Sequence, residues 1–278
     1  MSAQGREFAF TDTDFERIRG LIYAHAGISL NPGKRDMVYS RLARRLRATG
    51  IGSFEAYLEG LNPEVDEWQQ FVNSLTTNLT AFFREAHHFP VLAERLLATR
   101  RRGRIMLWSA ACSTGEEAYS MAMTAIDTLG SFTPPVRILA TDLDTQVLER
   151  ASQAVYPLER VAGLPEEHVR RFFLRGKGKQ AGFVRVRPEV RDLVLFRPLN
   201  LLGPQWPVRG PFDAIFCRNV LIYFDKPTQY RLLARLNPLL DPAGLLFLGH
   251  SENVAHAADL FRLRGKTVYA PVPRGRAA

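Results

Sequence analysis

The sequence predicts an α/β fold in which a small all-helical domain precedes a doubly wound, mostly parallel sheet with an inserted antiparallel β-subdomain. Three observations predict this fold. Apolar residues recur at helical spacing through residue 102. Short apolar runs then alternate with helical segments as far as residue 270, which is typical of parallel strands joined by helices. Between Tyr156 and Arg191 the alternation breaks, and two β-like runs flank a glycine-containing turn.

The N-terminal part is predicted to be helical. The first helix is expected to start at the capping box Thr13-x-x-Glu16 and to end at Gly27. Capping residues, closing glycines and apolar periodicity together predict helices over residues 13–27, 34–47, 53–60 and 64–75, then a loop and a linking helix. The domain boundary is placed near Arg102-Gly103, which gives a helical domain over 1–102 and a second domain over 103–278.

The second helix is predicted to have one apolar and one cationic face. Val38, Leu42 and Leu46 recur at a spacing of four residues, which places them on one side. The arginines that the pattern turns away from them are Arg41, Arg44, Arg45 and Arg47.

The second domain is predicted to contain six strands of the main sheet. They are expected at residues 105–109, 136–141, 193–196, 214–217, 245–249 and 267–270. Helices are expected between most of them, so that both faces of the sheet are covered. In such a sheet, ligands bind at the carboxyl ends of the strands.

The net charge of +9 is concentrated in the inserted hairpin. Residues 170–191 hold eight basic side chains and one acidic side chain, Glu189. A local patch of this kind is expected to attract an acidic partner of limited size, whereas a nucleic-acid channel more often interleaves cations with stacking aromatics. The alternative is an arginine-rich hairpin that is only solvated.

The run from Trp108 to Ser120, WSAACSTGEEAYS, is predicted to be a cofactor cradle. It follows a buried strand, consists of small residues, and leads into a helix whose first amides can face a ligand. Glu116 and Glu117 at the helix start would repel phosphate, which favours a cationic ligand such as S-adenosylmethionine. The alternative is that Ser113-x-x-Glu116 and Thr114-x-x-Glu117 are capping boxes that only start a helix.

Other polar residues are expected to reach the same edge of the sheet. Asp142 ends the second strand, where doubly wound folds place the acid that binds ribose hydroxyls, and it favours an adenosine ligand. Asn200-Leu201 follows the third strand and is suited to read and cover an adenine. Arg218-Asn219 follows the fourth, with Tyr223 nearby, and the polar segment TTNLTAFFRE leads in from the helical domain.

Composition excludes several classes of protein. A hydrophobic content of 46% and a charged content of 23% are ordinary for a globular protein. The charged start of the chain and the lack of a long apolar run predict a cytoplasmic protein without signal peptide or membrane insertion. Neither the two cysteines, Cys112 and Cys217, nor the pair His87-His88 has metal-ligand spacing, so no metal site is predicted.

Five collinear motifs resemble those of the CheR family, the chemotaxis receptor glutamate O-methyltransferases. They are TTNLTAFFREAHHFP, SAACSTGEEAYS, ATDLD, FDAIFCRNVLIYF and GHSEN, and the resemblance runs to about Val272. It implies a Rossmann-like class I methyltransferase sheet, S-adenosyl-L-methionine as cofactor and S-adenosyl-L-homocysteine as product. It also implies chemoreceptor cytoplasmic domains as partners, with a receptor C-terminal tail peptide expected at the β-subdomain.

The resemblance implies a set of site residues. Its cofactor contacts are Asn78, Thr80, Arg84, Glu117, Asp142, Asn200, Leu201, Arg218 and Asn219. Arg84 and Tyr223 match the residues with a catalytic role, and whether Arg84 serves chemistry or cofactor binding stays open. Because receptor methylation helices are acidic, the arginines of the second helix are expected to bind substrate. A monomer without nucleic-acid partners is expected.

Two other functions compete with this interpretation. A nucleic-acid methyltransferase is favoured by the sequence pI near 9.9. Base-amine methyltransferases, however, often carry an Asn/Asp-Pro-Pro-aromatic motif after the fourth strand, where this chain has Arg218-Asn219-Val220-Leu221. The third possibility is an adaptor that senses the cofactor without catalysis.

Overall fold

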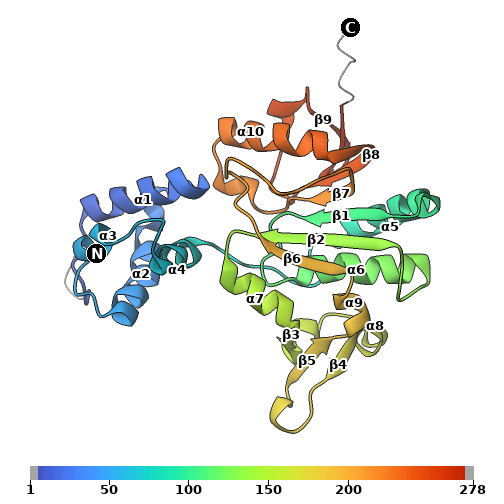
Figure 1. Ribbon diagram of the computed structural model, residues 1–278, viewed down its shortest axis with the longest axis horizontal. Helices are drawn as coiled ribbons and strands as arrows, with labels where there is room; N and C mark the ends of the chain where they lie inside the picture. Colours follow the sequence, from blue (N-terminus) through green and yellow to red (C-terminus); the bar gives the residue numbers. More distant parts are fainter. Residues whose placement is uncertain (1–5, 273–278) are drawn as a thin grey trace.

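The computed structural model of the protein describes residues 6–272 as a helical domain, a seven-stranded sheet with flanking helices, and a small three-stranded sheet (Figure 1). The outer ends of the two predicted domains, residues 1 and 278, lie outside the described residues. None of the helices within 6–272 is long and apolar enough to cross a membrane.

The helical domain contains the four predicted helices, and their apolar faces meet in one core around Ile18, Leu42 and Phe71. They are α1 (Asp12–Ala26), α2 (Arg35–Thr49), α3 (Phe54–Glu59) and α4 (Asp66–Leu75). The predicted capping box Thr13-x-x-Glu16 is wrong by two residues, because the N-cap of α1 is Thr11. Thr11 caps the helix by accepting the Asp14 amide, and the Asp14 carboxylate accepts the Thr11 amide.

The large sheet has five parallel strands and an antiparallel pair at one edge. Its strands are β1 (Ile105–Ser109), β2 (Val136–Asp142), β6 (Val194–Pro198), β7 (Phe212–Phe216), β8 (Leu240–Phe247), β9 (Phe261–Gly265) and β10 (Val268–Pro271). They are ordered β6-β2-β1-β7-β8-β10-β9, so the strand order reverses at β1. This is the doubly wound arrangement expected of a Rossmann-like methyltransferase.

Helices cover both faces of this sheet because its strands are apolar on both sides. Successive residues of a strand point to opposite faces. Leu107 and Phe216 accordingly join one core, and Trp108 and Ile215 join the other. The helices of this domain are α5 (His88–Thr99), α6 (Glu116–Leu129), α7 (Thr145–Gln153) and α10 (Lys226–Leu236).

The helix α5 packs with the sheet and not with the helical domain. Phe89, Leu92 and Leu96 share a core with Ile105, whereas the core of the helical domain ends at Leu75. By packing, the boundary therefore lies between residues 75 and 82, earlier than the predicted position at 102–103. Sequence periodicity places a helix but does not say which core it joins.

The inserted β-subdomain is larger than the predicted 170–191 hairpin. Its three antiparallel strands are ordered β3-β5-β4, with β3 (Val155–Pro157), β4 (Phe173–Arg175) and β5 (Phe183–Val186). The short helices α8 (Glu166–Phe172) and α9 (Pro188–Arg191) flank the last two strands. Figure 1 shows this subdomain projecting from the large sheet, well away from the helical domain.

Candidate active site

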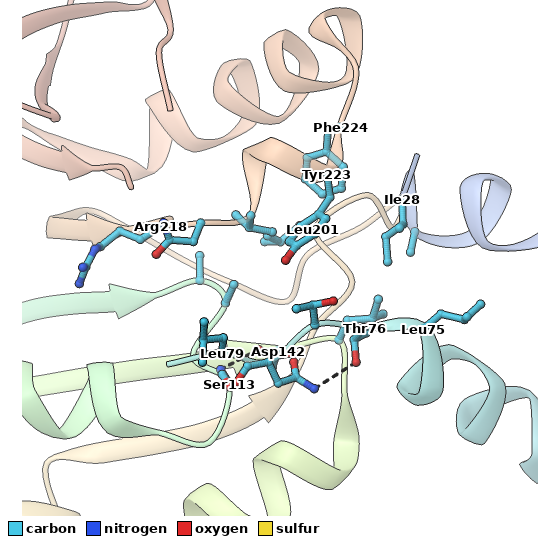
Figure 2. A pocket seen from close by; sticks show the side chains of 18 of the residues that line it. Ile28, Leu75, Thr76, Leu79, Ser113, Asp142, Leu201, Arg218, Tyr223 and Phe224 are labelled. Carbon is cyan, nitrogen blue, oxygen red and sulfur yellow. Dashed lines mark hydrogen bonds between the residues drawn. The ribbon is translucent and has the colours of Figure 1, made fainter. Parts of the chain in front are cut away.

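One pocket lies at the carboxyl ends of the parallel strands (Figure 2). Its walls come from the loops after β1, β2, β6 and β7 and from the segment that joins α4 to α5. In the parallel ladders Ser109 pairs with both Ala140 and Phe216, so the loops that follow these strands leave the sheet at the same edge. The pocket thus lies beside β1, where the strand order reverses, which is where doubly wound sheets bind ligands.

All of the residues predicted as cofactor contacts line this pocket, together with both predicted catalytic residues. They are Asn78, Thr80, Arg84, Glu117, Asp142, Asn200, Leu201, Arg218, Asn219 and Tyr223. The fold therefore gathers side chains that are separated by as many as 145 positions, from Asn78 to Tyr223.

The loop after β1 passes close to the neighbouring chain segments. Ser113 and Gly115 have positive φ angles of 49° and 95°. A Cβ atom on Gly115 would lie 2.9 Å from the Ala151 Cβ and 3.1 Å from the Tyr156 hydroxyl oxygen. Glycine is therefore required at this position, both for its backbone angle and for space.

The alternative of two capping boxes at 113–117 is wrong. The N-cap of α6 is Gly115, which offers no side chain to the helix. Glu116 instead forms an ion pair with Arg160, is fully buried, and is not among the described residues that line the pocket. Of the two glutamates expected to face the ligand, only Glu117 does so.

Glu117 and Arg218 form a buried ion pair in the pocket wall. The Arg218 Nη1 lies 3.1 Å from Glu117 Oε2, and the Ser109 hydroxyl donates to Glu117 Oε1 at 2.6 Å. Burial raises the pKa of Glu117, and the Arg218 charge opposes that rise. The pair fixes the direction of both side chains.

Asp142 presents a nearly enclosed carboxylate at the end of β2. Its Oδ2 accepts the Ser113 amide at 2.8 Å, and its Oδ1 accepts the Asp144 amide at 3.0 Å. Burial raises the pKa of Asp142 to about 6, although these amides favour the charged form. A carboxylate held this way still has lone pairs with which to accept hydroxyl donors.

Asp144 organises the segment that enters the pocket from the helical domain. Its Oδ2 accepts the Asn78 side-chain amide at 2.7 Å and the Thr76 hydroxyl at 2.8 Å, while its Oδ1 caps α7. The Ser113 hydroxyl donates to the Asn78 carbonyl at 2.9 Å. Asp144 was not predicted as a site residue, although an aspartate before a helix is an N-cap signal.

Asn200 is held differently from the predicted arrangement. Its side-chain amide donates to the His25 carbonyl at 2.7 Å, and its side-chain oxygen accepts the Leu202 amide at 2.9 Å. The predicted contact of this amide with an adenine edge therefore competes with bonds inside the protein. Leu201 is buried and lines the pocket beside it (Figure 2).

Arg84 and Tyr223 approach the pocket from two sides. The Arg84 guanidinium donates to the Leu79 carbonyl at 2.7 Å, and the residues on either side of Arg84, Phe83 and Glu85, have φ angles of 51° and 55°. Tyr223 ends the 3-10 helix η5 (Leu221–Tyr223), and its side chain points into the pocket in Figure 2. Unusual backbone angles on non-glycine residues cluster at functional sites.

Comparison with known proteins gives the family. Residues 13–76 match the model of the CheR methyltransferase all-alpha domain, and residues 78–270 match that of the CheR methyltransferase SAM binding domain. The chain belongs to the CheR methyltransferase family. It is 56% identical to chemotaxis protein methyltransferase 2 of Pseudomonas aeruginosa over 96% of this chain and 95% of that protein. It is also 56% identical to the chemotaxis protein methyltransferase of Escherichia coli, over 94% of this chain and 92% of that protein.

The all-alpha domain of this CheR protein supplies part of the pocket, which the sequence analysis missed. Ala26, Ile28, Ser29, Leu30, Lys34 and Met37 all line it. The approach is close: a Cβ atom on Gly27, whose φ is 64°, would lie 2.1 Å from Leu202 Cδ1. No sequence motif predicts this contact between Gly27 and Leu202, because it depends on how the two domains pack.

The cationic face of α2 is less free than its sequence pattern predicts. Arg41 donates to the carbonyls of Ser74 and Thr76, and Arg45 forms a two-pronged ion pair with Glu67. Arg47 pairs with Glu7, and the remaining arginine, Arg44, is exposed. None of the four is among the described lining residues of the pocket. Helix periodicity places these arginines on the outer side but does not show their partners.

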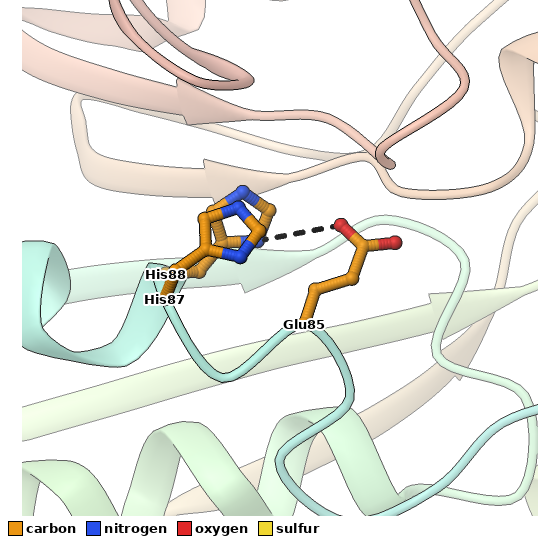
Figure 3. A group of neighbouring side chains, drawn as sticks. All are labelled: Glu85, His87 and His88. Carbon is orange, nitrogen blue, oxygen red and sulfur yellow. Dashed lines mark ion pairs between the residues drawn. The ribbon is translucent and has the colours of Figure 1, made fainter.

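Glu85, His87 and His88 lie close together (Figure 3). Their ligand-type atoms lie within 4.8 Å of one another, a grouping that the sequence analysis did not predict. Arg218, however, lies 3.6 Å from Glu85 Oε2 and already balances that charge. Burial, and next the Arg218 charge, lower the pKa of His88 to about 3, so its ring is neutral. The cluster therefore belongs to the surroundings of Arg218.

Proposed function

We propose that this protein transfers the methyl group of S-adenosyl-L-methionine to glutamate side chains of chemotaxis receptors. The products are glutamate methyl esters and S-adenosyl-L-homocysteine. The single observation that carries the proposal is that one pocket, at the switch point of a CheR SAM binding domain, gathers all the cofactor-binding and catalytic residues that the family resemblance implies. The names of its relatives, chemotaxis protein methyltransferases, support the same activity.

The residues present suit an adenosyl ligand with a positive charge and no phosphate. The buried carboxylate of Asp142, at the end of β2, lines the pocket and can accept hydrogen bonds, which supports its assignment to the ribose hydroxyls. The loop after β1 lines the pocket with the small residues Ala110, Ala111 and Ser113, which lets a ligand approach its backbone closely. We assign cofactor contacts to Asn78, Thr80, Arg84, Glu117, Asp142, Asn200, Leu201, Arg218 and Asn219.

The reaction needs positioning more than proton transfer. When bound, the cofactor supplies a methyl group on a sulfonium centre; a glutamate oxygen bonds to that carbon as the carbon–sulfur bond breaks, and the electron pair stays on sulfur. A free glutamate has a pKa of about 4.3 and is already ionised at neutral pH, so no general base is required. The pocket must align the carboxylate and remove its water.

Arg84 and Tyr223 are assigned to the acceptor side of the pocket. The Tyr223 side chain points inward and can orient a carboxylate through its hydroxyl group. A tight ion pair between Arg84 and the nucleophile would lower its reactivity, so we assign Arg84 to steering the substrate or to binding the cofactor carboxylate. Its bond to the Leu79 carbonyl holds it at the rim.

The β-subdomain is proposed to bind a receptor tail peptide. Its outer face carries Val155 and Leu174, each paired in register with the central Arg185. Val155, Leu174 and Phe183 are all exposed, by 39%, 42% and 42%. Apolar side chains around a cation, beside free strand edges, suit an extended acidic peptide that adds as a strand. The arginines of α2 are proposed to contact the acidic methylation helices, with Arg44 as the freest of them.

Methyl transfer from labelled cofactor to receptor cytoplasmic fragments tests this function. We expect label on the receptor fragments and none on an RNA control. We also expect the protein to be a monomer and to act in the cytoplasm. Transfer to RNA alone would support a nucleic-acid methyltransferase instead. Cofactor binding without transfer to either substrate would support an adaptor.

A further inference from the structure

Glu252 holds three backbone amides at the back of the pocket. It lies in the turn that follows β8 and is 5% exposed. Its Oε2 accepts the Asn219 amide at 2.9 Å and the Gly249 amide at 2.6 Å. Its Oε1 accepts the Leu221 amide at 2.7 Å. Both oxygens are therefore used, and a group with only one acceptor oxygen cannot replace them.

The amides at 219 and 221 belong to the segment that forms one wall of the pocket. Arg218, Asn219 and Tyr223 all lie on residues 218–224. Asn219 has a φ of 58°, an uncommon angle that needs outside support. The turn packs directly against it, because a Cβ atom on Gly249 would lie 2.9 Å from the Asn219 amide nitrogen.

The rest of this segment is held from other directions. The Gln229 side chain donates to the Leu221 and Phe224 carbonyls at 2.9 and 3.0 Å. The Ser29 amide, from the helical domain, donates to the Tyr223 carbonyl at 2.9 Å. The side chains of Arg218 and Asn219 bond to Glu117 and Glu85. Among the described residues, Glu252 is the side chain that binds the backbone amides at the beginning of the segment, where the chain leaves β7.

We propose that Glu252 is a positioning residue for the acceptor side of the pocket. This inference rests on the proposed methyl transfer. By holding the amides of Asn219 and Leu221, the carboxylate sets where Tyr223 and Asn219 stand relative to the reacting atoms. Misplacement by about 1 Å can cost on the order of 100-fold in rate. The residue acts through the backbone and does not itself line the pocket.

The test uses Glu252→Gln, which keeps the size of the side chain but replaces one acceptor oxygen with an NH2 group that opposes a backbone N–H. We expect kcat for receptor methylation to fall at least about tenfold at saturating substrates. The Kd for S-adenosylhomocysteine should rise less than kcat falls, because Asn219 is the only one of the nine assigned cofactor contacts whose backbone amide Glu252 accepts. Glu252→Asp, which keeps both oxygens, should recover part of kcat. Hydrogen exchange of amides 219–223 in the folded protein should become faster in Glu252→Gln.

Asp213→Asn is the matched control. Asp213 is also a buried carboxylate that accepts a backbone amide, that of Met106 at 3.1 Å, but it lies at the opposite end of β7. The Asp213→Asn variant should have a lower Tm, with unchanged kcat and unchanged hydrogen exchange at amides 219–223. Normal kcat in Glu252→Gln, or equal losses in both variants, would overturn the inference. Unchanged hydrogen exchange at amides 219–223 in Glu252→Gln would also overturn the inference, and this readout does not depend on receptor methylation. Failure of the wild-type protein to methylate receptors would instead count against the proposed function alone.

Discussion

At the residue scale, Asp142 is the side chain whose removal should weaken cofactor binding most directly. Its carboxylate is nearly enclosed at the end of β2 and lines the pocket. Asp142→Ala should weaken binding of S-adenosylhomocysteine by about 1.5 to 3 kcal/mol, the usual range for hydrogen bonds to a charged group. Calorimetry measures this, with the exposed Glu149→Ala on α7 as control. Equal affinities in the two variants would refute the assignment.

The pKa of Asp142 also predicts how binding depends on pH. Burial raises this pKa from 3.8 to about 6, so the carboxyl becomes protonated as the pH falls through about 6 and loses acceptor capacity. The Kd for S-adenosylhomocysteine should therefore rise between about pH 7.5 and pH 5.5. The folded state binds this proton more tightly than the unfolded chain does, so protonation of Asp142 increases the free energy of unfolding as the pH falls. Loss of folded protein through Asp142 therefore does not cause the expected rise in Kd. A Kd that stays constant over this range would contradict the prediction.

At the element scale, the arginines of α2 separate into structural and exposed groups. Arg44→Glu should raise the Michaelis constant for receptor by roughly fivefold, equivalent to about 1 kcal/mol, and leave cofactor affinity and Tm unchanged. Arg45→Glu should lower Tm, because it breaks the ion pair with Glu67 and leaves two acids together. An unchanged Michaelis constant for receptor in folded Arg44→Glu would show that Arg44 does not bind the receptor and that this face of α2 is only solvated.

The β-subdomain gives a second prediction at this scale. Replacing its tip, residues 177–181, with a short glycine turn should sharply reduce methylation of intact receptors, because tethering raises the local enzyme concentration to the order of mM. S-adenosylhomocysteine binding should barely change, since the tip contributes no pocket residue. Titration with receptor C-terminal peptides is the direct check. Equal binding of the peptide by the wild-type protein and the tip variant would contradict the tethering role.

Elements were predictable from the sequence where burial imposes a pattern. The strand β1 is buried at four of its five residues and was placed correctly at residues 105–109, because it is apolar on both faces. The strand β9 was missed because its alternation is short: only Phe261 and Leu263 alternate with arginines, and of its five residues only Phe261 is buried. The strand β3 was missed because it has only three residues. The cofactor-binding and catalytic residues predicted from the sequence line the pocket. Glu252 lies on the GHSEN motif, but the sequence did not predict its role, because its bonds to the Asn219 and Leu221 amides are tertiary contacts. The part of the pocket wall from the end of α1 likewise depends on tertiary contacts.

At the scale of the whole molecule, the pocket requires both domains. Gly27→Val should weaken S-adenosylhomocysteine binding, because the new side chain would push Leu202 and separate α1 from the loop after β6. Gly50→Val is a close control: Gly50 has a similar φ of 73° and also ends a helix, but no atom lies within 4 Å of its Cβ position. Both variants should lose stability from backbone strain. Equal cofactor affinity in the two would mean that the domain contact does not shape the pocket.

The most direct test of the central claim is the chemical identity of the product. Receptor cytoplasmic fragments incubated with the protein and S-adenosylmethionine should gain methyl groups on glutamate side chains, located by mass spectrometry of peptides. Mild base should remove these groups and release methanol, because they are esters. Base-stable methylation, methyl groups on other residues, or no modification of receptors by a protein that binds the cofactor would contradict the account.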